Sequence, residues 1–355
     1  MIKDKSIFIK NIYYMLAYAF QALNQSTYDD ISVEEFEDIH NLFAAILARG
    51  IGLQLKQGLY REYLNQKEDI SVMRGKINMP GTIKNKLGRK QVLTCEYDEL
   101  SENNLLNQIL KSTVIILLNH GKVKSEYKND LKKKMLFFSN VDILEPSSIK
   151  WSNIRFQRNN QTYRMLVGIC QLILQGMLLT TDKGEYKLDS FVNDKYMSSL
   201  YEKFILEYYI QKFSSFSVRA SQISWALDDG LGVMLPKMQS DITIQKDETV
   251  LIIDAKYYTR TTQVQFDKHK IHSNNLYQIF TYVKNKDSEF RDIPHSVSGL
   301  LLYAKTDEDI QPDNIYQMSG NKISVRTLDL NLQFEKIAEQ LNGIVEEHFG
   351  YIWKS

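Results

Sequence analysis

The stretch Ser240-Asp241-Ile242-Thr243-Ile244, followed by Val250-Leu251-Ile252-Ile253-Asp254-Ala255-Lys256, decides the fold of the second half of the chain. Two runs rich in β-branched residues are separated by a short charged turn, which is typical of a β-hairpin. Asp254 and Lys256 are two residues apart on one strand and therefore share a face of the sheet. We expect the hairpin to bring Asp241, on the partner strand, beside them.

These three side chains have the chemistry of a phosphodiesterase site. Two carboxylates, Asp241 and Asp254, are hard oxygen ligands suited to Mg²⁺, and the backbone carbonyl of Ala255 can add a third oxygen. Lys256 can orient or help to deprotonate a metal-bound water. An isolated Asp-x-Lys is more often an exposed ion pair. The aliphatic strand before it and the second carboxylate favour the catalytic interpretation.

Two further groups are candidates for supporting the site. Gln278 and Tyr282 lie four apart on a predicted helix and share a face, where they can contact a phosphate or order the lysine. Glu202 lies on the predicted helix before the strands and can support a metal. For each of these residues an ordinary solvated surface position is the alternative interpretation.

The order acid, Asp-x-Lys, Gln-x-x-x-Tyr resembles the PD-(D/E)xK nuclease superfamily, with Ser240 in place of the usual proline. More narrowly, the chain resembles the McrC family, the nuclease subunits of McrBC-type modification-dependent restriction systems. The residues that carry this resemblance are Lys10–Leu16, Arg74–Ile77, Asn107–Thr113, Asp241–Ile244, Asp254–Tyr258 and His272–Gln278.

The resemblance implies that Asp241, Asp254 and Lys256 are the catalytic triad of a Mg²⁺-dependent DNA endonuclease acting on methylated double-stranded DNA. It also implies a partner, a McrB-like hexameric AAA+ GTPase, which the N-terminal part of the chain binds and stimulates. Because a double-strand break needs two cuts, we expect nuclease domains to dimerise in the complex.

The periodicity predicts an α+β protein of two domains. Residues 1–185 read as a helical N-terminal domain with a small β insertion, which the resemblance makes the motor-binding domain. Residues 186–355 read as an αβ domain, which the resemblance makes restriction-endonuclease-like. The polar stretch Thr180–Asp189 is the candidate linker.

The β insertion contains a basic segment punctuated by glycine, Pro80–Lys90, between predicted strands. It is either a projecting hairpin or finger, or an ordinary exposed loop. The resemblance makes residues 61–94 the candidate contact with the motor, and Arg74, Lys76 and Arg89 are the basic residues expected to make it.

Composition excludes several other classes. The 355 residues carry a formal net charge of +1, so the chain is not polybasic and its DNA affinity must come from a local patch or a partner. Two cysteines, Cys95 and Cys170, exclude a disulfide scaffold and fit a reducing cytoplasm. No apolar run approaches the roughly 18 residues of a membrane span. The sequence lacks a nucleotide-binding Gly-x-x-x-x-Gly-Lys-Ser/Thr loop.

Two alternative functions remain open at this point. One is an adaptor that activates a motor NTPase without cutting DNA. The other is a stand-alone PD-(D/E)xK repair nuclease that needs no partner. The intact set of Asp241, Asp254 and Lys256 favours a working nuclease, and the resemblance of the N-terminal region favours a partner.

Overall fold

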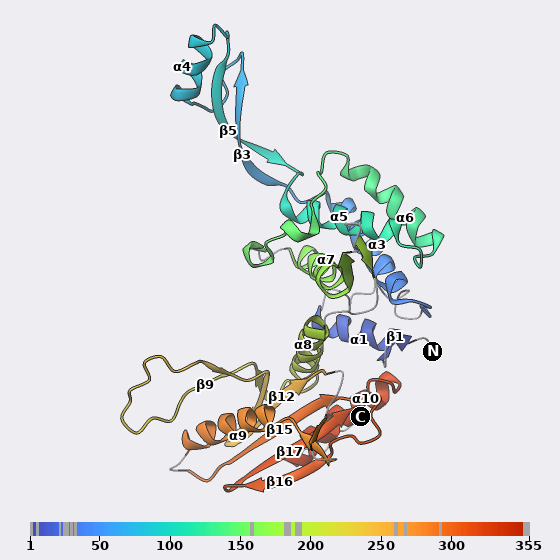
Figure 1. The fold of residues 1–355 in the computed structure, drawn as a ribbon, viewed down its shortest axis with the longest axis vertical. Helices are drawn as coiled ribbons and strands as arrows, with labels where there is room; N and C mark the ends of the chain where they lie inside the picture. The colour runs from blue at the N-terminus through green and yellow to red at the C-terminus, as the bar shows by residue number, and fades with distance from the viewer. Residues whose placement is uncertain are drawn as a thin grey trace. The chain divides into compact units, whose positions relative to one another are not determined.

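The expected hairpin is part of a mixed sheet. In the computed structural model, β11 (Ile242–Lys246) pairs antiparallel with β12 (Thr249–Lys256), and Ile242 lies opposite Ile253 (Figure 1). The structure describes residues 3–4, 7–20, 23, 28, 31, 34–156, 160–180, 186–188, 194–258, 262–265, 268–290 and 293–350. None of the helices in these ranges is long and apolar enough to span a membrane.

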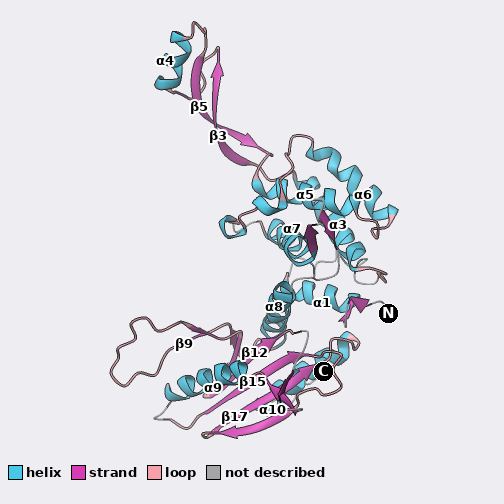
Figure 2. Ribbon diagram, in the orientation of Figure 1, coloured by secondary structure: helices cyan, strands magenta, loops and turns pink. Residues whose placement is uncertain are grey.

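The chain divides into two units, each described here by itself. The first, the sheet unit, comprises Met1–Leu42, Gln175–Leu179 and Asp189–Ser355. The second, the helical unit, comprises Phe43–Leu174 and Thr180–Leu188. Mixed helices and strands confirm the α+β class (Figure 2).

The sheet unit is built on six strands in the order β16-β17-β15-β12-β11-β8. The other strands are β8 (Ser217–Arg219), β15 (Ser296–Ala304), β16 (Asn314–Met318) and β17 (Asn321–Leu328). Strand β12 pairs in parallel with β15, which pairs in parallel with β17, whereas β8, β11 and β16 join antiparallel. Strand β12 is therefore central, and its aliphatic residues Val250–Ile253 are completely buried.

Helices cover both faces of this sheet (Figure 1). Helix α9 (Ser273–Ser288) packs on one face, where Ile279 and Val283 join a core with Ile252 and Leu301. The helices on the other face are α8 (Asp194–Lys212), which packs against β11 and β12, and α10 (Phe334–Phe349), which packs against β17. Short pairs complete the unit: β1 (Lys3–Asp4) with β2 (Ile7–Phe8), β9 (Gln222–Ile223) with β10 (Met238–Gln239), and β13 (Thr262–Gln265) with β14 (Lys268–Ile271).

The units do not follow the predicted division at residue 185. Helix α1 (Ile9–Ala19) packs against α8, and the Asn11 side-chain amide donates to the carbonyl oxygens of Leu330 (2.7 Å) and Leu332 (2.8 Å). Residues 1–42 therefore belong to the same unit as the C-terminal region. Of the predicted linker, only β7 (Tyr186–Leu188) and Thr180, the last residue of β6 (Leu178–Thr180), lie within the described residues.

The helical unit contains most of the helices predicted for the first half of the chain. They are α3 (Ile39–Gln57, which begins in the sheet unit), α5 (Leu105–Asn119), α6 (Ser125–Met135), α7 (Gln161–Gln171) and a π-helix, η6 (Leu172–Met177), with 3₁₀ turns at Leu136–Phe138, Pro146–Ser148 and Trp151–Asn153. Asn104 caps α5 by accepting a hydrogen bond from the Asn107 amide.

A long hairpin projects from this unit (Figure 2). Strands β3 (Glu62–Ile70) and β5 (Leu93–Ser101) pair over nine residues each, from Glu62 opposite Ser101 to Ile70 opposite Leu93. The short strand β4 (Lys76–Ile77) adds to β5. The predicted finger is thus present.

Most of the basic segment on this hairpin is a helix, which neither a projecting hairpin nor an exposed loop had included. Helix α4 (Met79–Leu87) begins at Asn78, whose side chain accepts a hydrogen bond from the Gly81 amide at 2.9 Å. Pro80 occupies its first turn, where a missing N–H costs nothing. Gly81 lies so close to Thr94 on β5 that a Cβ would fall 2.5 Å from the threonine hydroxyl.

Close approach of α9 to the sheet depends on Gly299 in β15. A Cβ there would lie 2.8 Å from both Ile279 Cγ1 and Val283 Cγ2. Real side chains do not approach this closely in a packed core, so the helix or the strand would have to move.

We therefore predict that Gly299→Ala destabilises the protein by about 1–3 kcal/mol through overpacking. Gly343→Ala in α10 is the matched control, because nothing lies within 4 Å of its added Cβ. That change should stabilise by about 0.5–1 kcal/mol, since glycine disfavours helix interiors. Urea unfolding monitored by circular dichroism measures both; equal effects of the two substitutions would contradict the close-approach argument.

Candidate active site

The predicted carboxylates and lysine meet at the end of the central hairpin. Asp241 immediately precedes β11, and Asp254, Ala255 and Lys256 form the end of β12. Because Ile242 lies opposite Ile253, Asp241 and Asp254 follow on as neighbours across the two strands. Strand β12 lies inside the core along its length, and Asp254 near its end is 0% exposed.

Direct contacts join the three side chains. The Ala255 amide donates to Asp241 Oδ2 at 2.8 Å, and Lys256 Nζ donates to Asp254 Oδ1 at 2.8 Å. Asp254 Oδ2 also lies 2.8 Å from the ammonium, but it accepts no hydrogen bond from any described residue. A buried carboxylate oxygen is thus left with unused acceptor capacity, which is uncommon in folded proteins.

Burial sets the protonation behaviour of this cluster. The pKa of Asp254 is raised to about 7, first by burial and then by the Asp241 carboxylate, against the lowering effect of Lys256. Burial also raises the pKa of Asp241. Burial alone would lower the pKa of Lys256, but the Asp254 and Asp241 charges outweigh it and the pKa rises. The site therefore holds two carboxylates that one ammonium only partly compensates.

The structure brings Glu202 to this cluster. The residue lies on α8, and its Oε1 accepts a hydrogen bond from Ser198 at 3.0 Å. Its pKa is raised by burial and by the Asp241 charge, and the Lys256 charge lowers it. Glu202 is thus near enough to interact electrostatically with the site, although no hydrogen bond joins it to the three central residues.

Gln278 and Tyr282 form a pair of their own on α9. Gln278 Nε2 donates to the Tyr282 hydroxyl at 2.9 Å, and the tyrosine ring joins the core between α9 and the sheet. Within the described residues, no hydrogen bond or ion pair links either one to Asp241, Asp254 or Lys256. They do not contact the lysine in this structure, and their support of the site, through a phosphate or through the lysine, stays a prediction.

A chain of polar residues that the sequence did not single out does lie beside the site. Tyr258 donates to Asn275 Oδ1 at 3.3 Å, and Asn275 Nδ2 donates to the Tyr303 hydroxyl at 2.9 Å. Tyr303 lies beside Lys256 in the register of β15 with β12. Burial raises the pKa of Tyr303 to about 12, so it remains a neutral hydroxyl. Tyr258 and Asn275 fall in stretches that carried the family resemblance, which is the signal that could have marked them.

Ser240 stands before the first acid, where the PD-(D/E)xK superfamily usually has proline, and it forms hydrogen bonds that proline could not all make. Its backbone N–H donates to the Ser221 carbonyl at 3.0 Å, and its hydroxyl accepts from the Ser221 amide at 3.1 Å. Proline has no N–H and would lose the first of these bonds. These two hydrogen bonds therefore hold the chain just before Asp241 against Ser221.

The donor set suits a hard cation. No group of three or more His, Cys, Asp and Glu within the described residues is arranged to hold a metal. Mg²⁺ does not require one, because it is usually held by one or two carboxylates together with waters and substrate phosphate. The Asp254 carboxylate, Asp241 and the Ala255 carbonyl fit that pattern.

The basic residues predicted to meet a partner lie on the hairpin of the helical unit. The Arg74 guanidinium stacks 3.9 Å from the centre of the Tyr97 ring and lies 3.4 Å from Glu99. Lys76 lies opposite Glu96 on β5. Arg89 follows α4 with a φ of 58° and is exposed.

Comparison with known proteins gives a consistent match. Residues 4–304 match the family described as McrBC 5-methylcytosine restriction system component. The chain is 28% identical over 344 residues to the Escherichia coli (strain K12) protein described as type IV methyl-directed restriction enzyme EcoKMcrBC, covering 96% of this chain and 97% of that protein.

A solved structure shares the fold at low sequence identity. It is a half-complex from a tetradecameric assembly of Thermococcus gammatolerans McrB AAA+ hexamers with bound McrC, and the aligned chain is 18% identical with a TM-score of 0.50. The match covers 95% of this chain and 76% of that one.

The raised pKa of Asp254 gives a prediction about stability. Its ordinary value is 3.8, so between about pH 4 and 7 the folded state retains a proton that the unfolded state loses. Stability contributed by this group is therefore present at low pH and lost as the pH rises through 7. Relative to Asp254→Asn, which cannot ionise, the wild-type protein should lose stability between pH 5 and pH 8.

Urea unfolding at the two pH values, without divalent cations, measures this difference. Asp247→Asn is the control, because Asp247 is exposed on the turn of the same hairpin. A difference between wild type and Asp254→Asn that did not change with pH would show that burial of this carboxylate has no such cost.

Proposed function

The chain belongs to the family of McrBC 5-methylcytosine restriction system components, and from this we propose that it is the McrC-type subunit that cuts DNA. The observation that carries the proposal is the cluster of Asp241, Asp254 and Lys256 at the end of a buried strand. A carboxylate that is buried beside another carboxylate has a high cost in free energy, and such arrangements concentrate at functional sites.

We further propose that the sheet unit has the PD-(D/E)xK nuclease arrangement. Support comes from the mixed sheet, the helices on both faces, and the placement of both acids and the lysine on adjacent strands. Glu202 on the preceding helix adds a fourth charged group at the position where a metal-supporting carboxylate would act.

In this proposal Asp241, Asp254 and the Ala255 carbonyl hold Mg²⁺, which when bound supplies a positive charge at the scissile phosphate. Lys256 keeps its proton, because the two carboxylates raise its pKa. Its ammonium can orient a water for attack and stabilise the charge that develops on the phosphate. Tyr258, Asn275 and Tyr303 hold the polar surroundings of the lysine in place.

The proposed substrate is methylated double-stranded DNA, and the proposed partner is a McrB-like hexameric AAA+ GTPase. The net charge of +1 suits a subunit that gains most of its DNA affinity in a complex. Two copies of the nuclease domain acting together would supply the two cuts of a double-strand break.

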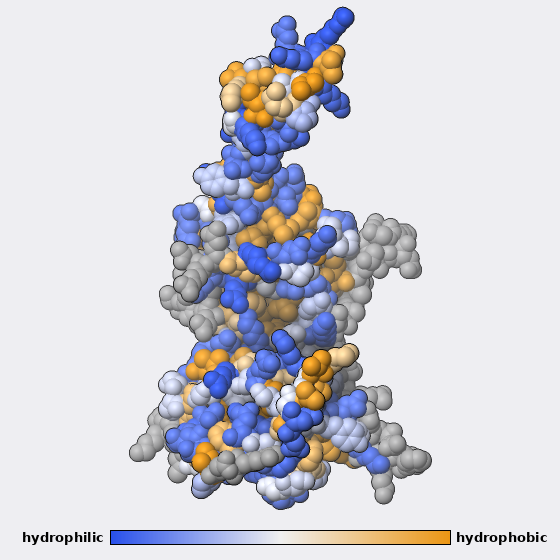
Figure 3. All heavy atoms as spheres, turned by 90° about the vertical axis from the view of Figure 1, so that its left-hand side faces the viewer, coloured by the Kyte–Doolittle hydropathy of each residue, from blue (hydrophilic) through white to orange (hydrophobic). Residues whose placement is uncertain are grey.

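We propose the hairpin with α4 as the surface that contacts and stimulates the motor. Arg74, Lys76 and Arg89 are exposed on it. Apolar side chains are exposed beside them, and Figure 3 shows hydrophobic and hydrophilic side chains together at this end of the unit. Those apolar residues are Val72, Met73, Met79, Ile83 and Leu87. Such mixed apolar and basic surfaces are typical of protein interfaces.

The first test is cleavage of methylated plasmid by the full-length chain with its partner, GTP and Mg²⁺. Asp254→Asn should reduce cutting at least about 100-fold, because even outer-shell partners of a metal are worth 10–100-fold. Asp247→Asn, at the other end of the same hairpin, should cut like the wild type. GTP turnover should be the same in all three.

Other outcomes separate the alternatives. Cutting by Asp254→Asn at the wild-type rate would exclude this site as the nuclease centre. Wild-type protein that stimulates GTP turnover but never cuts DNA would be an adaptor. Cutting without any partner would identify a stand-alone nuclease.

The second test addresses the hairpin. Arg89→Ala should weaken stimulation of the partner GTPase several-fold, because Arg89 is exposed and forms no ion pair with a described carboxylate. The control is Arg155→Ala, an arginine of the same unit that lies outside the hairpin and, within the described residues, hydrogen bonds to the Ser152 carbonyl alone. Both variants should unfold like the wild type. Equal GTPase stimulation by Arg89→Ala and wild type would remove this residue from the interface.

A further inference from the structure

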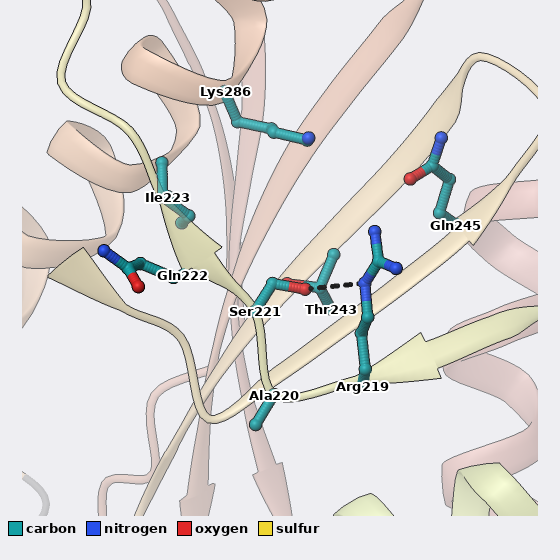
Figure 4. A pocket seen from close by; sticks show the side chains of 8 residues that line it. All are labelled: Arg219, Ala220, Ser221, Gln222, Ile223, Thr243, Gln245 and Lys286. Carbon is teal, nitrogen blue, oxygen red and sulfur yellow. Dashed lines mark hydrogen bonds between the residues drawn. The ribbon is translucent and has the colours of Figure 1, made fainter.

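A pocket of about 240 Å³ opens in the sheet unit, outside the carboxylate cluster (Figure 4). Its polar lining comes from the edge strand β8, the segment after it, strand β11 and helix α9. The residues that matter are Arg219, Ser221, Gln222, Thr243, Gln245 and Lys286. None of the residues that line it is acidic or aromatic.

The pocket is close to the candidate catalytic site on the same face of the sheet. Thr243 follows Asp241 by two residues along β11, a distance of about 7 Å on a strand, and residues two apart share a face. Arg219 lies directly opposite Thr243 in the pairing of β8 with β11. The pocket therefore begins at Thr243, the next residue after Asp241 on the same face of the sheet.

Buried hydrogen bonds hold the pocket in a fixed position relative to Asp241. The Ser240 residue is 1% exposed, and its hydroxyl lies 2.8 Å from the Thr243 hydroxyl and 3.1 Å from the Ser221 amide. Ser240 thus contacts both Ser221 and Thr243, which line the pocket. Such a bridge keeps Ser221 and Thr243 in register with the site.

The charge of the pocket is positive. Arg219 hydrogen bonds through Nε to the Ser221 hydroxyl at 3.3 Å, and it makes no ion pair with any carboxylate in the described part of the chain. Its two terminal nitrogens are directed into the open space in Figure 4, and the Lys286 side chain points toward the same space. Lys286 is paired with Glu289, so Arg219 is the principal cation available to a ligand.

We propose that this pocket binds a backbone phosphate of the DNA strand, next to the phosphate that is cut. An arginine fork, side-chain amides and hydroxyls without a carboxylate form a site for a phosphate oxygen. The absence of an aromatic lining residue argues against a nucleotide held by its base. The inference rests on the proposed nuclease function and deepens it: Arg219 is a positioning residue that sets where the strand lies relative to Asp241.

The test is binding of duplex DNA to the full-length chain, followed by fluorescence anisotropy over a range of salt concentrations without divalent cations. Loss of one phosphate contact lowers the slope of log affinity against log salt by about 0.9. We expect that change for Arg219→Gln, with affinity about eightfold weaker at 0.1 M salt. Arg219→Lys keeps the charge and should keep most of the slope.

Lys336→Gln on α10 is the matched control, since it neutralises one exposed cation away from the pocket. Equal binding by wild type and Arg219→Gln, including equal absence of binding, would overturn the inference. Cutting by the wild-type complex would then show that the proposed function stands without it. Inorganic phosphate at matched ionic strength should compete with DNA for the wild type and not for Arg219→Gln; phosphate that binds the wild type without displacing DNA would assign the pocket to a free phosphate and also overturn the proposal.

Discussion

The burial of the Asp254 carboxylate beside Asp241 is the constraint on which the rest of the site depends. A buried carboxylate is unfavourable unless a cation or hydrogen bonds compensate it. Lys256 supplies one ammonium for two acids, and one oxygen of Asp254 accepts no hydrogen bond from a described residue. The folded chain therefore holds an excess of negative potential at one point. That excess costs stability, and in the proposed function it attracts the divalent cation to this point.

The surrounding fold is what makes such a costly arrangement tolerable. Strand β12 enters the core with completely buried aliphatic residues on both faces, so its end cannot move away from the hydrophobic layers. Helix α9 comes close to the sheet because Gly299 has no side chain, and it carries Asn275 into contact with Tyr303. Helix α8 brings Glu202 to the other side. Hydrophobic burial thus supports the strained electrostatics, as is usual for active sites.

The parts of this structure that the sequence predicted were those encoded by local patterns. Period-two alternation and a charged turn were enough to place Asp241, Asp254 and Lys256 together, because pairing across a short hairpin leaves little freedom. The packing of α1 on α8 and the Asn275–Tyr303 contact depend on residues far apart in sequence, so periodicity could not predict them. Helix α4 was missed for another reason: it contains Pro80 and Gly81, which usually mark turns, and its stability comes from the Asn78 cap and from packing of Gly81 on Thr94.

Ser240 shows how one departure from a family pattern can carry information. Where related nucleases are expected to have proline, this chain has a residue that donates its backbone N–H and whose hydroxyl makes three hydrogen-bond contacts. Those bonds tie the segment after Arg219 to the strand that begins with Asp241. A proline would hold the backbone of the acid but could not make this connection, since it has neither the N–H nor the hydroxyl. The serine therefore couples the position of a cationic pocket to the position of the proposed catalytic carboxylate, and a strand of DNA that contacts both would be held at two points of a single rigid element.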